Sequence, residues 1–431
     1  MMEAAASDVL TADDPLYEEL YDVRREAEAM GNFIERDVTA EIAALRAQAP
    51  VHKGKLRELL GLPGHERHAN GAGRQHYTVL TYDACEAAFR NPAVFSNTIQ
   101  MDPKAGPGTG LLEIDPPRHR AYRRAIQPKF QMNEALGWWR KRTIDGIVER
   151  LIERLARRPG AELNLDFCAR IPVYTITTAI GLHGDEALRF RHAYLNSTSS
   201  SRNIPTEQRI ENFRLVESLL HGLVAARREQ PGDDLISFLL DATLSLPGAP
   251  PRPLTDAEIV THAKLVMVAG GGTSWRQMGI TLFALLTHPD QFAEVKADRG
   301  LMDAAIEEGL RWDPTAPYHY RLVLEDVDFY GHHIKAGSAL ELGLGPANRD
   351  PARWAHPDAY DIHRPPLTNM AFGLGTHRCL GMNVARVEIG VGINALIDAF
   401  PKLRLDPAAP APFLTGGLEQ RGPSGLPVLL D

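Results

Sequence analysis

A glycine-rich loop that carries a cysteine and runs directly into a helix constrains this chain more than any other stretch. Within residues 371–388, Gly373 and Gly375 precede Cys379, and an amphipathic run at helical spacing follows. Glycines let a loop turn tightly and approach a flat ligand without Cβ clashes. Backbone N–H groups at a helix N-terminus favour a thiolate over a thiol. The sequence therefore predicts a rigid, shielded thiolate, which suits the axial ligand of a haem iron.

The residues around Cys379 decide between a ligand and a buried packing residue. A lone cysteine is more often a small buried hydrophobe. Here Phe372, Gly373, Gly375 and His377 stand at fixed spacings before it. This pattern resembles the haem-binding signature of the cytochrome P450 family, the haem-thiolate monooxygenases. The resemblance implies that Cys379 ligates the iron of haem b, and that Phe372, Gly373 and His377 contact the cofactor.

Length alone suggests two or three domains, but the chain shows no internal boundary and is expected to form a single intracellular domain. The 431 residues are 44% hydrophobic, and no linker or repeat divides residues 1–431. A net charge of −8 argues against nucleic-acid binding. Residues 1–14 contain no signal pattern, and no apolar run reaches the roughly 18 residues of a membrane span. The three scattered cysteines fit a reducing compartment. We therefore expect a cytoplasmic monomer without a membrane anchor.

A basic helix is predicted after Asp115 and the two prolines that follow it. Residues 117–132 contain no acid, and a charge run usually marks a solvated face. However, Asp115-Pro-Pro-x-His119-x-x-x-Arg123 resembles the family's helix that grips the haem propionates. His119 and Arg123 share one helix face, and an arginine fork can bind a carboxylate bidentately. The resemblance also implies that Arg321 binds a propionate.

A long helix is predicted over residues 255–286, beginning with a capping box. Three consecutive glycines, residues 270–272, each cost roughly 1 kcal/mol relative to alanine. They indicate close helix packing, two helices instead of one, or a distortion that makes room for a ligand. The stretch from Ala269 to Thr273 resembles the family's oxygen-groove motif. This implies that Thr273 is the proton-relaying alcohol, that Ala269 contacts haem and that Gly270 lines the substrate pocket.

The residue before Thr273 departs from the family pattern. The family usually has an acid there, whereas this chain has Gly272. Thr273 must then draw protons from ordered water or from a distant group. The departure keeps open a haem-thiolate enzyme that uses peroxide or reduces nitric oxide. A haem-binding sensor or carrier without catalytic activity is the alternative of another class.

An ion-pair triad is predicted ahead of the cysteine loop. Glu308 and Arg311 are three residues apart on a predicted helix and can pair. On a surface such a pair contributes less than about 1 kcal/mol. In the family the matching pair is buried and joined by a later arginine, here best matched by Arg364. The resemblance implies a structural role for all three residues.

Together the motifs cover nearly all of the chain from residue 115 onward. They imply the cytochrome P450 fold, mainly α with a minor β region, with haem between the long helix and the cysteine loop. They also imply oxidation of a small hydrophobic substrate by dioxygen, with two electrons from a ferredoxin and its reductase. The remaining expected pocket residues are Ala316, Tyr318 and Phe413. The ferredoxin is expected to dock on the basic residues Arg118, Arg120, Arg124 and Lys129.

Overall fold

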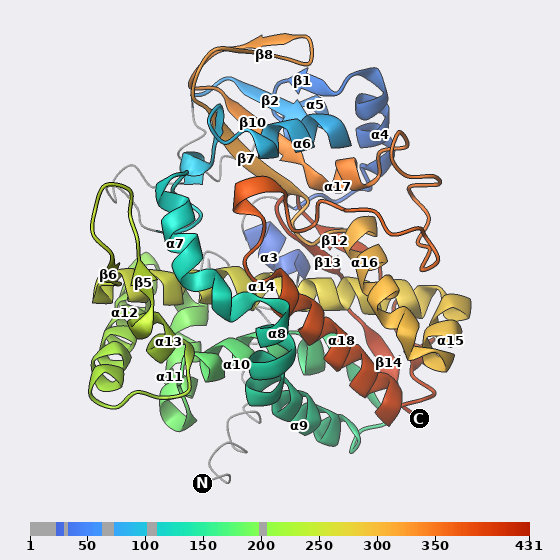
Figure 1. Ribbon diagram of the computed structural model, residues 1–431. Coiled ribbons are helices and arrows are strands. Elements are labelled where there is room, and N and C mark those ends of the chain that lie inside the picture. The colour runs from blue at the N-terminus through green and yellow to red at the C-terminus, as the bar shows by residue number, and fades with distance from the viewer. Residues whose placement is uncertain (1–22, 30–32, 63–72, 101–109, 198–204) are drawn as a thin grey trace.

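A computed structural model describes residues 23–29, 33–62, 73–100, 110–197 and 205–431. Helices fill most of the molecule, and a small β region forms the upper part of the view in Figure 1. This arrangement confirms the predicted mainly-α class with a minor β region. Among the described helices, none combines the length and the apolar composition that a bilayer crossing requires.

The longest helix, α14, runs through the middle of the molecule (Figure 1). It spans Asp256–Thr287, close to the predicted range. The predicted capping box is present: the Glu258 N–H donates to Thr255 Oγ1 at 3.3 Å, and the Thr255 N–H donates to Glu258 Oε2 at 2.8 Å. The helices that pack on α14 include α10 (Arg170–Ala179), α16 (Met302–Trp312) and α18 (Met382–Ala399).

The three glycines do not interrupt α14, which stays helical through residues 270–272. A Cβ atom on Gly270 would lie 2.7 Å from Ile176 Cδ1 of α10, and one on Gly271 would lie 3.5 Å from the Tyr194 hydroxyl. Close packing against α10 therefore explains Gly270, and α14 shows no distortion at the three glycines. The place of Gly270 in the substrate pocket stays a prediction.

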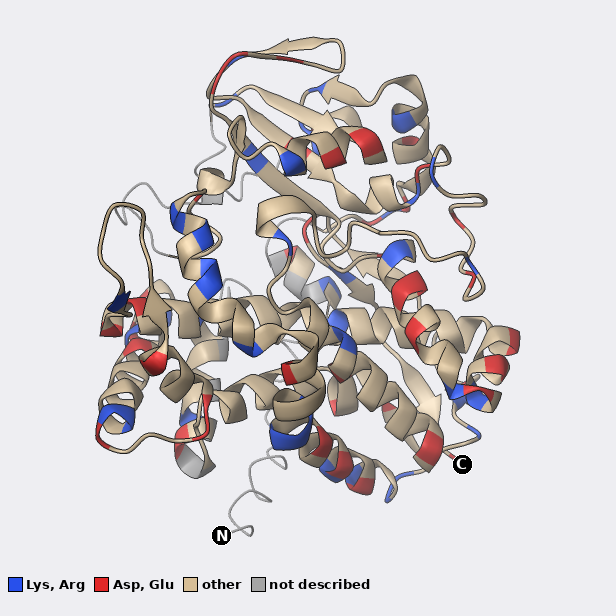
Figure 2. Cartoon of the chain, viewed as in Figure 1, with Lys and Arg blue, Asp and Glu red and all other residues tan. Residues whose placement is uncertain are grey.

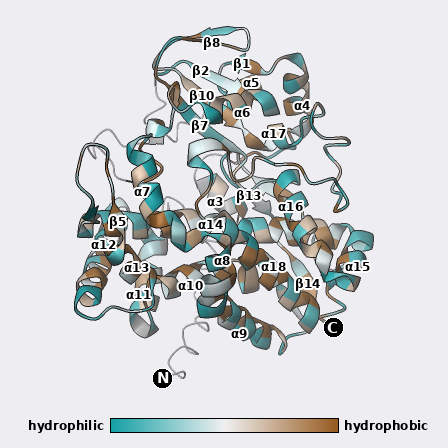
Figure 3. Ribbon diagram, viewed as in Figure 1, coloured by the Kyte–Doolittle hydropathy of each residue, from teal (hydrophilic) through white to brown (hydrophobic). Residues whose placement is uncertain are grey.

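The outer helices bury one side and expose the other. Figure 3 shows hydrophobic and hydrophilic residues alternating along α9, α12 and α15, as expected of amphipathic helices. The remaining helices are α3 (Val23–Ala29), α4 (Thr39–Gln48), α5 (Leu56–Leu59), α6 (Tyr82–Arg90), η1 (Asn97–Gln100), α7 (Arg118–Ile126), η2 (Gln127–Phe130), α8 (Met132–Glu134), η3 (Ala135–Ile144), α9 (Asp145–Leu155), η4 (Asn164–Cys168), α11 (Gly184–Ser197), α12 (Thr206–Glu229), α13 (Leu235–Asp241), α15 (Pro289–Ala297), η5 (Arg299–Leu301), α17 (Leu344–Asn348) and η6 (Gly375–His377).

A five-stranded sheet forms the β region, with the order β1-β2-β10-β7-β3. Strand β10 pairs parallel with β2, and every other pairing in this sheet is antiparallel. The sheet packs on α6 and α17 around a core of its own. Its strands are β1 (Val51–Lys53), β2 (His76–Val79), β3 (Phe95–Ser96), β7 (Tyr318–Val323) and β10 (Ala339–Gly343).

Strands β12 (Leu414–Gly416) and β13 (Arg421–Pro423) form a hairpin near the C-terminus. It packs against α14 and α3, so this hairpin and the first described helix lie together beside the long helix. The remaining strands are β4 (Gly160–Glu162), β5 (Thr243–Leu244), β6 (Arg252–Pro253), β8 (Val327–Phe329), β9 (His332–Ile334), β11 (Arg404–Leu405) and β14 (Pro427–Leu429).

A buried carboxylate joins α7 to the first turn of α14. The Tyr122 hydroxyl donates to Glu258 Oε1 at 2.5 Å, and Arg252 donates to both Glu258 oxygens at 2.8 Å. Burial would raise the pKa of Glu258, but the hydrogen bonds from Arg252 and Tyr122 outweigh it and lower the pKa to about 2. Glu258 is therefore ionised at any physiological pH, and it fixes α7 against α14.

Candidate functional site

Cys379 lies in a tightly folded loop between η6 and α18. Its backbone N–H donates to the Phe372 carbonyl at 2.8 Å. Gly373 and Gly375 adopt φ angles of +64° and +67°, which L side chains rarely adopt. A Cβ atom on Gly375 would lie 2.4 Å from the Phe89 carbonyl oxygen, so only glycine fits against α6. The loop is therefore fixed by its own backbone, as its glycines predict.

The ionisation of Cys379 is only partly as predicted. Burial raises the pKa of its thiol. The backbone N–H groups of Gly381 and Met382 lower this pKa, as expected at a helix N-terminus, and so do the charges of Arg123 and Arg386. Burial nevertheless outweighs them. A coordinating metal cation would deprotonate this thiol outright.

Two buried histidines form the centre of the predicted propionate site. The rings of His119 on α7 and His377 on the cysteine loop are 4.2 Å apart, centroid to centroid. Burial lowers the pKa of His119 to about 3 and also lowers that of His377. His377 Nε2 lies 3.3 Å from Asp115 Oδ1, but Nδ1 of each ring is buried without a hydrogen-bond partner. Both neutral rings therefore present an unsatisfied polar atom.

Two arginines complete this cluster. Arg321 on β7 is buried and donates to the Tyr320 carbonyl at 2.8 Å. Burial lowers the pKa of Arg321 to about 10, so its side chain is still charged at neutral pH. Arg123 donates to the Arg378 carbonyl of the cysteine loop at 2.7 Å. Two cations and two imidazoles thus converge beside Cys379, and this set fits the carboxylates of a haem.

The middle of α14 presents an open, apolar face. Val268 is 63% exposed although it lies in the central part of a helix that crosses the molecule, and Ala269 is exposed beside it. Thr273, one turn further, donates from Oγ1 to the Ala269 carbonyl at 2.8 Å. Small residues on an open helix face leave room for a flat ligand, which fits the predicted haem contact of Ala269.

A buried arginine lies next to Gly272, the position at which the family pattern has an acid. Arg276 on α14 is 2% exposed and donates from Nη1 to the Gly272 carbonyl at 2.5 Å. A Cβ atom on Gly272 would lie 3.2 Å from this nitrogen. A cation therefore adjoins the position before Thr273. Arg276 was not among the residues predicted from the sequence, although its spacing of four from Gly272 places the two on one helix face.

Strand alternation places Tyr318, a predicted pocket residue, on the sheet face opposite to Arg321. Tyr318 and Arg321 lie three residues apart on β7, so their side chains point to opposite faces of the sheet. Tyr318 packs in a separate cluster with Ile34 and Leu56, away from the Arg321 face. His319 shares the face of Arg321 instead, and burial lowers its pKa to about 4. Because side chains alternate along a strand, the position two residues before Arg321 predicts that His319 lies on the same face.

That Phe413 and Ala316 line the substrate pocket stays a prediction. Phe413 is 54% exposed next to β12, and its N–H donates to Ser424 Oγ at 3.1 Å. Ala316 is half-buried just before β7. The exposed apolar ring of Phe413 suits contact with a hydrophobic molecule.

The predicted triad forms with the expected geometry. Arg311 donates from Nε and Nη2 to the two oxygens of Glu308 at 2.7 Å each. Arg364 donates to Glu308 Oε1 at 3.2 Å. The side chains of Glu308 and Arg311 are only 4% and 2% exposed, and Arg311 also donates to three backbone carbonyls. The triad holds the segment that leads to the cysteine loop.

The predicted docking patch is smaller than expected. Arg118, Arg120 and Arg124 are exposed on α7, and Figure 2 shows this helix as a basic strip. Lys129 does not belong to it. Its ammonium nitrogen lies 3.9 Å from the centroid of the Trp138 ring and pairs with the glutamate of α8, and its side chain is 14% exposed.

Comparisons with known proteins agree with this site. A family model described as Cytochrome P450 matches residues 190–409. The chain is 34% identical to cytochrome P450 105C1 of Streptomyces sp over 398 residues, which cover 90% of this chain and 94% of that protein. It is 30% identical to the vitamin D3 dihydroxylase of Streptomyces griseolus, over 83% of this chain and 88% of that enzyme. The crystal structure of CYP109E1 from Bacillus megaterium in complex with testosterone superposes with a TM-score of 0.79 at 25% identity, covering 92% of this chain and all of that one.

Proposed function

The chain belongs to the cytochrome P450 family, and from this premise we propose that it oxidises a small hydrophobic substrate with dioxygen. The family's members are haem b monooxygenases, so the chain is an oxidoreductase. Two electrons would come from a ferredoxin and its reductase. The convergence of the cysteine loop, the cationic cluster and the open face of α14 supports this proposal most strongly.

The cofactor would be held from three sides. Cys379 would ligate the iron, and Ala269, Phe372 and Gly373 would contact the cofactor. His119, Arg123, Arg321 and His377 would bind the propionates. A haem bound through a thiolate supplies an iron whose electron density promotes O–O cleavage.

The chain's own acid–base groups would supply protons to the open face of α14. The Thr273 hydroxyl, oriented by its bond to the Ala269 carbonyl, would relay them. Glu388 on α18 is a candidate source, because it is 2% exposed and hydrogen-bonds to Ser274, next to Thr273. Burial raises the pKa of Glu388 to about 8, so this carboxyl group holds a proton at neutral pH.

A spectral screen followed by turnover tests the proposal. The relatives named above concern vitamin D3 and testosterone, which supports an apolar substrate. A compound library is screened for the low-to-high-spin shift, and each hit is then assayed for substrate-dependent NADH oxidation with ferredoxin and reductase. Product formation is the expected result. Tight ligand binding without substrate-dependent NADH oxidation would instead identify a sensor or carrier.

Reversing two charges on α7 is expected to slow electron transfer strongly. Ferredoxins are acidic, so Arg120→Glu with Arg124→Glu should lower the association rate at low salt by about tenfold or more. Stopped-flow reduction over a range of ionic strength measures the effect, and the wild-type rate should fall as salt rises. Arg157→Glu with Lys402→Glu changes the net charge equally outside α7 and should leave the rate almost unchanged. A salt-independent wild-type rate would contradict docking at α7.

A second candidate function is peroxide use or nitric oxide reduction, favoured by Gly272 and the adjacent Arg276. Assays with peroxide, and with nitric oxide plus reduced nicotinamide, test it directly. If neither supports turnover while ferredoxin does, this alternative is excluded.

Restoring an acid before Thr273 is expected to change little. An Asp at position 272 would lie against the Arg276 guanidinium, which would hold it as a carboxylate and not as a proton donor. Gly272→Asp should therefore alter coupled product by less than about threefold, whereas an effective general acid contributes about 100-fold or more. Product per NADH is measured, with Gly272→Asn as the uncharged control. A gain of about tenfold or more, seen only with Asp, would show that the missing acid limits the wild type.

A further inference from the structure

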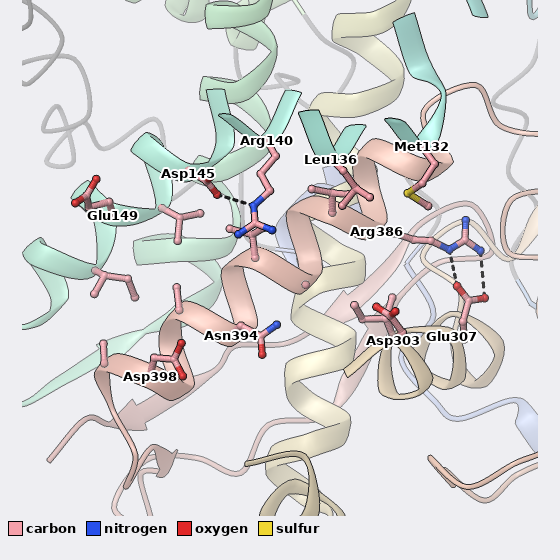
Figure 4. A pocket seen from close by; sticks show the side chains of 18 of the residues that line it. Met132, Leu136, Arg140, Asp145, Glu149, Asp303, Glu307, Arg386, Asn394 and Asp398 are labelled. Carbon is pink, nitrogen blue, oxygen red and sulfur yellow. Dashed lines mark hydrogen bonds and ion pairs between the residues drawn. The ribbon is translucent and has the colours of Figure 1, made fainter. Parts of the chain in front are cut away.

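A groove of about 960 Å³ opens on the face of the molecule formed by α8, η3, α9, α16 and α18 (Figure 4). It begins at Arg386, one turn into α18, and continues along that helix to Asp398. Its floor is apolar, and Leu136 and Met132 at one end are 49% and 44% exposed. The floor residues are Val148, Ile152, Ile306, Val387, Gly390, Val391 and Ala395.

The rim of the groove is anionic. Arg140 and Arg386 are its basic residues, and both are already paired: Arg140 Nε lies 3.0 Å from Asp145 Oδ1, and Arg386 Nε lies 2.5 Å from Glu307 Oε1. Of the four other carboxylates, Asp398 pairs with Arg299 at 2.8 Å, and three remain in excess of these pairs: Glu149, Glu153 and Asp303. All four are exposed.

A polar atom inside the groove also requires a donor. Asn394 lines the groove between the apolar residues of α18, and its Oδ1 is buried without a hydrogen-bond partner. Carboxylates and an amide oxygen are all acceptors. An occupant that satisfies them must bring N–H groups and positive charge together with apolar surface.

We propose that this groove binds a basic amphipathic helix of a partner protein. The stretch of α18 from Arg386 to Asp398 rises by roughly 18 Å, the length of a helix of about three turns. The apolar face of such a helix would cover the floor, and its flanking lysines or arginines would meet the carboxylates. The anionic rim disfavours acidic ferredoxins and anionic lipid surfaces as occupants.

The groove is a different surface from the basic strip of α7. Arg118, Arg120 and Arg124 offer donors and positive charge, whereas the groove offers acceptors and negative charge. Both lie on the side of the molecule that faces the viewer in Figure 1, α7 above α8 and α18. The proposal is independent of which redox partner uses α7.

Binding of a designed peptide tests the groove on the full-length, haem-loaded protein. The probe is a fluorescein-labelled 14-residue helix of leucine and lysine, and fluorescence anisotropy measures its dissociation constant. Saturable one-to-one binding is expected. Glu149→Lys with Glu153→Lys should weaken it by about tenfold or more, because two attractive charges become repulsive. The red-shifted Soret band of the reduced carbon monoxide complex verifies that each variant is folded.

Two further variants separate groove binding from unspecific attraction. Glu207→Lys with Glu211→Lys makes the same charge change at the same spacing on the exposed surface of α12 and should change binding by less than about twofold. Gly390→Leu adds no charge but fills the floor, and it should weaken binding as strongly as the charge reversal. The proposal is overturned if the α12 variant weakens binding equally, or if Gly390→Leu has no effect. It is also overturned if the wild type is a dimer that the Glu149/Glu153 variant dissociates, because a second copy would then occupy the groove.

Discussion

Replacing Cys379 with serine is expected to abolish the strongly red-shifted Soret band of the reduced carbon monoxide complex. A hydroxyl group is nearly the size of a thiol, and the loop fixed by Gly375 and the Phe372 carbonyl should survive the exchange. Serine does not supply the soft thiolate sulfur that gives the band and promotes O–O cleavage. Ferredoxin-dependent turnover should fall to background. Difference spectra at equal haem content measure the first effect, and product analysis measures the second.

Cys85 offers the matched control. It is fully buried under β10, and its sulfur lies 3.6 Å from the Val79 carbonyl and 3.8 Å from the Gly343 carbonyl. Cys85→Ser makes the same chemical change and gives the new hydroxyl two acceptors, so the red-shifted band should remain. A well-folded, haem-loaded Cys379→Ser protein that keeps the band would refute the proposed ligand.

Replacing Glu308 with alanine is expected to lower the free energy of unfolding by roughly 3–5 kcal/mol, the usual cost of removing one partner from a buried ion pair. The exchange leaves the charges of Arg311 and Arg364 inside the protein without their carboxylate. The urea midpoint at equal haem loading measures the loss, provided that the slope of the transition is unchanged.

The neighbouring Glu307 shows whether burial is the cause. It pairs with Arg386 but is 44% exposed. Since exposed pairs contribute about 0–1 kcal/mol, Glu307→Ala should shift the midpoint only slightly. Equal losses in the two variants would contradict the structural role assigned to the triad.

Local sequence patterns predicted the elements of the site well. The 32-residue helix, the cysteine loop and the pair of Glu308 with Arg311 follow from periodicity, glycine placement and spacing, all of which act within a few residues, whereas Arg364 was added from the family resemblance. The convergence of His119, Arg321 and His377 joins three distant segments. Only the family resemblance predicted it, because no local rule brings such segments together.

For three predicted residues, tertiary contacts set side-chain directions and partners that the sequence did not indicate. Tyr318 and His319 are adjacent, and the pairing of β7 with β10 decides which of them shares the Arg321 face. The Ile176 side chain on α10 leaves no room for a Cβ atom at Gly270, and the Lys129 ammonium group lies over the Trp138 ring. In each case a tertiary contact determines the outcome, and a single sequence does not reveal it.

The bond network of Glu258 has a consequence for assembly of the holoprotein. The permanently charged carboxylate of Glu258, on the helix that bears Thr273, accepts a hydrogen bond from Tyr122 on the helix that bears His119, and Arg252 holds this carboxylate in place. The gap between these two helices is therefore set by the polypeptide itself. Porphyrin would therefore enter a compartment between α7 and α14 whose width is already fixed before the cofactor binds.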